Sequence, residues 1–112
     1  MKKQSKTGSQ TAVNIAKTAV LELDGKQHRL VYDFNAICAA ESVAGCNLLH
    51  ALENLGDLTG MQLRGLLYAA MKPFSADVTI EEVSVMIRLD AIGAITKSLA
   101  EAYALSVPGK TQ

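Results

Sequence analysis

Short helical repeats, each with its own start and stop signal, dominate the chain from Asp33 onward. Apolar residues recur there at spacings of three and four, which is the period of one face of an α-helix. Asp33 and Asn47 can accept hydrogen bonds from the free amides at helix starts, whereas Gly45 and Gly56 favour helix ends. The pattern therefore predicts a series of short helices and leaves little room for a large sheet.

Two capping boxes mark further helix starts. Thr59 is followed by Gln62, and Thr79 by Glu82, so each threonine and its partner can bond the other's backbone amide. Pro73 prevents the first of these helices from continuing. The sequence thus predicts one helix that begins after Thr59 and another that begins after Thr79.

Asp90 divides the last apolar stretch. Residues 80–89 carry apolar side chains on more than one face of a helix, and Asp90 is expected to end that helix and to cap another. In the final helix Ile92, Ile95 and Leu99 repeat at helical spacing. Each helix is expected to span about ten to fourteen residues, a length that depends on packing for its stability.

Before the helices, two short segments alternate in the manner of strands. Residues 20–23 and 27–31 flank Asp24-Gly25, a dipeptide that favours the tight turn of a hairpin. Alternation sets Val20 on a different face from Leu21 and Leu23, whereas the face of Leu30 stays open because the sequence does not fix the register. The predicted fold is mainly α: a small bundle of about four to five short helices preceded by one N-terminal β-hairpin at residues 20–31.

Charge is distributed unevenly along the chain. The 112 residues hold 11 Lys and Arg against 11 Asp and Glu, so no overall field draws the molecule to nucleic acid or a membrane. Residues 1–18, however, hold four lysines and no acid, and the first eleven of them are polar. We predict a largely disordered basic leader at 1–18, a single helical domain at 19–106 and a frayed tail at 107–112.

The sequence predicts a cytoplasmic protein. No apolar run follows the N-terminal lysines, as a secretory signal requires, and no stretch reaches the roughly 20 apolar residues of a membrane span. In that compartment Cys38 and Cys46 are expected to be reduced, and to be buried as small apolar residues.

Motifs that carry chemistry are not evident. The glycines occur singly, without the Gly-rich turn that holds a phosphate, and a zinc site would need both cysteines with His28 and His50 at unsuitable spacings. His50 has Glu53 three positions on, yet spacing assigns it no nucleophile. We predict that the protein is not an enzyme and has no cofactor and no metal; an enzyme built on His50 and Cys46 is the alternative.

An apolar surplus is the most distinctive feature. Hydrophobic residues make up 49% of the chain, and three of the four methionines lie in the third and fourth predicted helices. Methionine fills cores and also recurs at adaptable binding surfaces. A helix that is apolar all round has too few neighbours in so small a domain, which favours an interface and self-association. The residues predicted to bind a partner are Met61, Met71, Phe74, Val85, Met86 and Leu89.

One segment resembles a known family. The run Phe34-Asn35-Ala36, followed by Glu41 and Gly45, comes directly after the predicted hairpin. It resembles the tail assembly chaperones of long-tailed phages and of gene transfer agents, and the pattern of helices extends the resemblance over about residues 19–106. The resemblance implies a non-enzymatic protein of the bacterial host cytoplasm that binds the tape measure protein, keeps it soluble and recruits tail tube subunits during virion assembly.

A small helical regulatory or DNA-associated adaptor is the alternative function, with the basic leader steering it to nucleic acid. Lysines without arginine or interleaved aromatic residues are a poor nucleic-acid signature, so nucleic acid is not expected as a partner. A tape measure is instead a long amphipathic helix whose apolar stripe aggregates when uncovered. A small protein with surplus apolar surface is suited to cover it.

Overall fold

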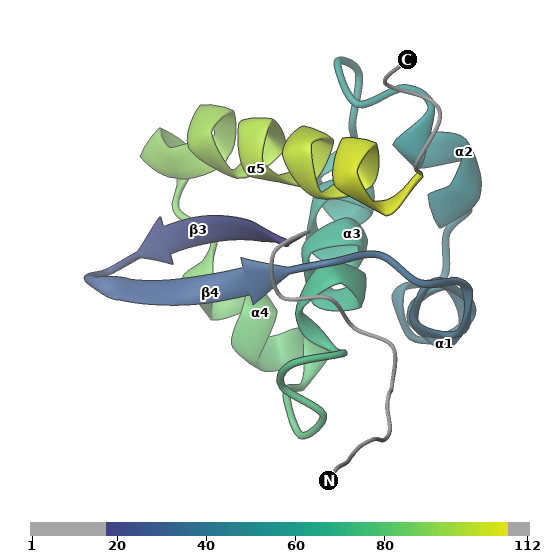
Figure 1. Cartoon of the computed structure of the whole chain (residues 1–112), viewed down its shortest axis with the longest axis horizontal. Coiled ribbons are helices and arrows are strands. Elements are labelled where there is room, and N and C mark those ends of the chain that lie inside the picture. The colour runs from purple at the N-terminus through teal and green to yellow at the C-terminus, as the bar shows by residue number, and fades with distance from the viewer. Residues whose placement is uncertain (1–17, 108–112) are drawn as a thin grey trace, which may run out of the picture.

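The computed structural model describes residues 18–107, which form a helical bundle around one central helix with a hairpin across it (Figure 1). Within that range five α-helices follow a two-stranded hairpin, so the predicted fold class is confirmed. The predicted basic leader at 1–18 and the predicted tail at 107–112 lie outside the described residues, apart from Thr18 and Val107. The elements are β3 (Ala19–Leu23), β4 (Lys26–Leu30), α1 (Phe34–Ala44), α2 (Leu48–Leu52), α3 (Gly60–Met71), α4 (Ile80–Met86), the 3-10 helix η2 (Leu89–Ala91) and α5 (Ile92–Ser106).

The hairpin turns at Asp24 and Gly25, which adopt φ angles of 53° and 80° in the left-handed region. Its antiparallel register sets Ala19 opposite Leu30. Directly opposed residues of an antiparallel pair lie on the same face, so Leu30 is buried together with Leu21. The sequence left the face of Leu30 open because that face depends on the cross-strand register, and the pairing with Ala19 decides it.

Helix α3 is the centre of the molecule. Helices α1, α2, α4 and α5 and strand β4 all contact it, and residues 65–71 are buried without interruption. The C-terminal part of α3 is therefore surrounded on every side. Met71 is only 2% exposed, so its predicted place on a partner-binding surface was wrong.

Helix starts follow the predicted capping residues. The side chain of Asp33 accepts a hydrogen bond from the Ala36 amide, and that of Asn47 from the His50 amide. Both predicted capping boxes form, at the starts of α3 and α4. Gly45 ends α1 with a φ of 72°, as the sequence predicts.

Helix ends were predicted less well. Helix α2 has 5 residues and α4 has 7, so both are shorter than expected, and α4 stops at Met86 because Ile87 is extended. Asp90 does not cap α5; it lies in η2, where its carboxylate pairs with Arg88 at 3.3 Å. The N-cap residue of α5 is Ala91, whose side chain makes no capping hydrogen bond.

Helix α5 covers the hairpin and ties the two ends of the described chain together. It packs on β3, and the Ser98 hydroxyl donates a hydrogen bond to the Val20 carbonyl oxygen at 3.5 Å. Since a lone two-stranded hairpin is marginal, the contacts from α5 and α3 stabilise it. Within residues 18–107 no helix combines the length and apolar character that a membrane crossing needs.

Candidate functional site

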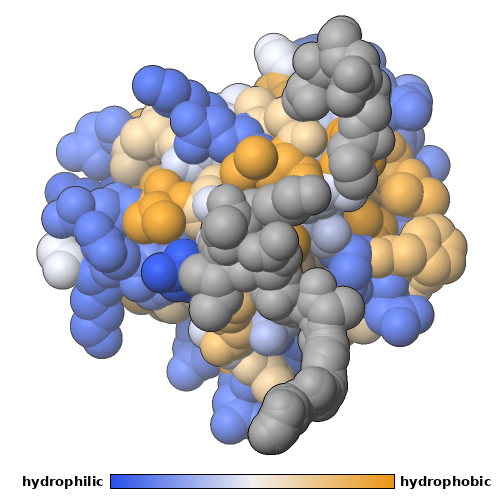
Figure 2. All heavy atoms as spheres, viewed as in Figure 1, coloured by the Kyte–Doolittle hydropathy of each residue, from blue (hydrophilic) through white to orange (hydrophobic). Residues whose placement is uncertain are grey.

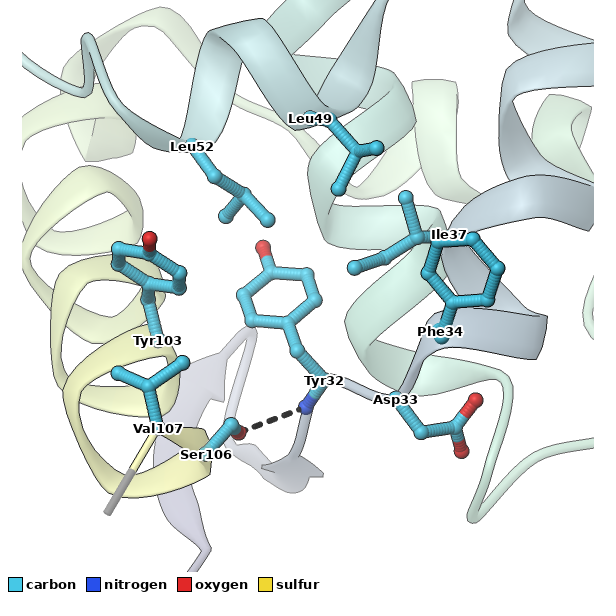
Figure 3. A pocket seen from close by; sticks show the side chains of 9 residues that line it. All are labelled: Tyr32, Asp33, Phe34, Ile37, Leu49, Leu52, Tyr103, Ser106 and Val107. Carbon is cyan, nitrogen blue, oxygen red and sulfur yellow. Dashed lines mark hydrogen bonds between the residues drawn. The ribbon is translucent and has the colours of Figure 1, made fainter. Parts of the chain in front are cut away.

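An apolar groove opens between the connection from β4 to α1, helix α2 and the C-terminal end of α5 (Figure 3). We call it the α2 groove; its volume is about 470 Å³. In Figure 3 the leucines of α2 and the ring of Tyr103 face the ring of Tyr32 across the space. The lining residues are Tyr32, Asp33, Phe34, Ile37, Leu49, Leu52, Tyr103, Ser106 and Val107.

Tyr32 is a fixed part of the groove wall. Its backbone amide donates to the Ser106 hydroxyl at 3.0 Å, and its own hydroxyl donates to the Leu66 carbonyl at 2.9 Å. Burial raises the pKa of the Tyr32 hydroxyl above its ordinary value, so this side chain stays neutral and serves as a hydrogen-bond donor. The contact joins the groove to the central helix α3.

The mouth of the groove carries large apolar side chains that water contacts. Phe34, the first residue of α1, is 65% exposed, and Leu49 in the first turn of α2 is 46% exposed. In Figure 2 apolar side chains gather at the right-hand side, where Figure 1 places α1 and α2. Exposed apolar residues around a hollow are typical of a surface that another molecule covers.

Glu41 holds helix α2 in place. One carboxylate oxygen accepts hydrogen bonds from the backbone amides of Leu48 at 2.9 Å and Leu49 at 3.2 Å. A helix of five residues cannot satisfy its first amides internally, so Glu41 and Asn47 together supply the acceptors that α2 lacks. Glu41 thereby positions the leucines of α2 at the groove.

We expect Glu41→Gln to destabilise the protein by about 1–3 kcal/mol, because the two amides lose a charged acceptor. Thermal or urea unfolding measures the change. Glu22→Gln, at an exposed position of β3, is the matched control and should leave the unfolding free energy almost unchanged. Equal stability of the two variants would show that the Glu41 carboxylate does not hold α2.

A second hollow continues the α2 groove past Tyr103 and adds Asn47, His50 and Glu53 to its lining. His50 is exposed, and its ring lies 3.4 Å from the side-chain amide of Asn54. The Cys46 thiol, half-buried, donates instead to the Met61 carbonyl at 3.8 Å. Among residues 18–107 no three His, Cys, Asp or Glu side chains gather as metal ligands would.

The predicted burial of both cysteines was wrong. Cys38 is exposed because the buried side of α1 is formed by Ile37, Ala40 and Ala44, which face the rest of the core. Cys46 is only partly buried, just after the end of α1. Both thiols are free, so at least Cys38 can be reached by reagents from solution.

None of the six residues predicted to bind a partner lines the α2 groove. Val85 and Leu89 are the most exposed of them, at 84% and 88%, and Met61 is also exposed. Phe74 and Met86 are half-buried. We call Val85, Met86 and Leu89 the α4 edge; it is separate from the groove, since Figure 1 shows α4 and α2 on opposite sides of α3.

Sequence reasoning missed the groove because its walls come from three distant segments, at residues 32–37, 49–52 and 103–107. Phe34 shares the helical phase of the buried Ile37, so periodicity alone assigns it to the core. The signal that singles it out is its place in the Phe34-Asn35-Ala36 segment. Comparison of this chain with protein-family models, with curated proteins and with solved structures finds no match.

Proposed function

We propose that this protein is a tail assembly chaperone that binds the apolar stripe of a tape measure protein in the α2 groove. One observation carries the proposal: the residues that resemble the family also build the groove. Phe34 lines it, Glu41 anchors α2 beside it, and Gly45 makes the left-handed turn that lets α2 follow α1. Acting in the host cytoplasm, the chaperone would keep the tape measure soluble and recruit tail tube subunits.

The groove suits one face of an amphipathic helix. Helix-in-groove recognition uses a few apolar side chains at helical spacing as anchors, and the groove is lined largely by apolar side chains. Full burial of one such anchor contributes about 1.5–3 kcal/mol, whereas association costs about 4–15 kcal/mol in lost freedom. A single copy therefore binds weakly. Many copies along one long helix gain strength through avidity.

The alternative, a DNA-associated adaptor, receives no support from the groove. Its lining and that of the adjoining hollow include the acids Asp33 and Glu53 and no lysine or arginine. Such a surface repels phosphate. Duplex DNA binding that weakens steeply with added salt would favour the adaptor instead.

The test of the chaperone proposal is co-expression of this chain with a tape measure protein. We expect the tape measure to aggregate when it is expressed alone, and to remain in the supernatant and co-purify when this protein is present. The soluble fraction of the tape measure is the measurement. A tape measure that precipitates equally with and without this protein would overturn the proposal.

The α4 edge is our candidate for self-association. Val85 and Leu89 are almost fully exposed apolar side chains, and their burial between copies would favour a dimer or larger assembly. Sedimentation at high micromolar concentration should show assembly. Val85→Asp combined with Leu89→Asp should weaken it at least about tenfold, since each tenfold step corresponds to about 1.4 kcal/mol. A wild type that stays monomeric would contradict this assignment.

A further inference from the structure

Among the described residues, strand β4 pairs with β3 alone, so its other edge is open to a further strand. In a hairpin with a two-residue turn, the residues that flank the turn exchange both backbone hydrogen bonds, and every second pair after them does the same. Leu23 and Lys26 flank the turn, so the register makes Gln27 and Arg29 members of non-hydrogen-bonded pairs. Their backbone amides and carbonyls therefore point away from β3.

A hydrogen bond further along this edge supports the assignment. The next outward amide after Arg29 is that of Val31, and it donates to the Ala70 carbonyl of α3 at 3.1 Å. Helix α3 thus satisfies the edge at that point. No described residue bonds the outward backbone groups of Gln27 or Arg29. We call residues 26–29 of β4 the hairpin edge.

The hairpin edge is exposed and lies apart from the α2 groove. The side chains of Lys26, Gln27 and Arg29 are exposed, and that of His28 is half-buried. In Figure 1 the turn end of the hairpin extends to one side of α3, whereas α1 and α2 lie on the other side. A molecule bound at the hairpin edge therefore leaves the groove free.

Charge determines which strand fits the hairpin edge. Strand β4 carries Lys26 and Arg29 and no acid, and neither basic side chain forms an ion pair within residues 18–107. Pairing between the β4 strands of two copies would bring these like charges together, and edge lysines are a common means of preventing such pairing. An acidic strand would instead place opposite charges side by side.

We propose that the hairpin edge binds an extended acidic segment of another protein as a third strand of the sheet. Backbone hydrogen bonds to Gln27 and Arg29 supply affinity, and the basic side chains select the sequence. In an antiparallel partner strand, the residues opposite Arg29 and Lys26 are three positions apart. The preferred segment therefore has two acids separated by two residues.

A designed peptide tests the proposal on the full chain. The probe is a head-to-tail cyclised β-hairpin with Thr-Glu-Val-Thr-Glu-Thr in one strand, because a preorganised strand loses less freedom on binding. At millimolar concentration it should shift the NMR signals of the Gln27 and Arg29 amides and protect both from hydrogen exchange. A peptide with Lys in place of both Glu should bind at least about tenfold more weakly. Signals that stay unmoved would overturn the proposal.

The variant Gln27→Pro isolates the backbone contribution. Proline is tolerated where the amide faces away from the sheet, so this change removes an outward donor and no hydrogen bond of the hairpin. Binding of the acidic peptide should weaken at least about tenfold. Leu21 and His28 pair across the hairpin, and their protected amides would show that it still forms. Unchanged affinity in a variant with an intact hairpin would contradict strand addition.

Charge reversal gives a test that does not depend on proline. Lys26→Glu combined with Arg29→Glu should reverse the preference, so that the lysine peptide binds more tightly than the glutamate peptide. The original preference, if retained, would overturn the proposal. A dimer that Gln27→Pro dissociates would also overturn it, because a second copy would then occupy the edge. No tape measure is present in these experiments, so this inference and the proposed function fail separately.

Discussion

Gly65→Leu is expected to destabilise the protein by about 3 kcal/mol or more, because the site has no space for a side chain. A Cβ atom at Gly65 would lie 2.9 Å from the Ala44 Cβ and 2.9 Å from a Leu48 methyl. The Leu48 methyl can turn away, but the Ala44 Cβ is fixed to its backbone, so α1 has to shift from α3. The Tm should fall by about 12–24 °C for a domain of this size.

Gly93 is the matched control. It also lies in a helix, but nothing is within 4 Å of the position where its Cβ would be. Gly93→Leu should therefore leave the free energy of unfolding unchanged or raise it by up to about 1 kcal/mol, through better helix propensity. If Gly65→Leu were as stable as Gly93→Leu, the close approach of α1 and α3 would not be required for folding.

Charged side chains at the groove mouth are expected to abolish co-purification with the tape measure. Phe34→Asp and Leu49→Lys introduce opposite charges at exposed positions of the α2 groove. Both should prevent binding, because burial of an unpaired charge costs several kcal/mol whatever its sign, more than one anchor contributes. Circular dichroism should show that both variants remain helical, since the replaced side chains lie largely in water.

Val43 supplies the control for this test. It lies on the same helix as Phe34, is 50% exposed and does not line the groove. Val43→Asp and Val43→Lys should co-purify with the tape measure as the wild type does. If the groove variants stay folded and still hold the tape measure, the groove is not the binding site.

Local signals in the sequence account for what could be predicted of the fold. A cap acts within one helical turn, so Asp33, Asn47 and the two capping boxes identify helix starts from short segments alone. Asp90 has the same local form, yet its carboxylate pairs with Arg88 instead of a helix amide. Predictions fail where a side chain has a second local partner that the pattern does not show.

Burial and the groove depend on long-range packing, and the sequence does not encode these as a periodic signal. Met71 and Val85 both belong to apolar stretches, but Met71 lies in the half of α3 that other elements surround, whereas α4 packs by one side and leaves Val85 in water. Leu30 is buried because of its cross-strand partner. In the same way Phe34, Leu49 and Tyr103 share a site only because the tertiary fold brings three segments together.

The contact between α5 and β3 sets the time at which the chain can fold during synthesis. The ribosome makes the hairpin first and α5 last, at about 5–20 residues per second, so several seconds separate the two. Throughout that time Leu21 and Leu23 lack the helix that later covers them. Until residues 92–106 have been made, the hairpin can pack on α3 alone, so the part of the core around Leu21 closes late in synthesis.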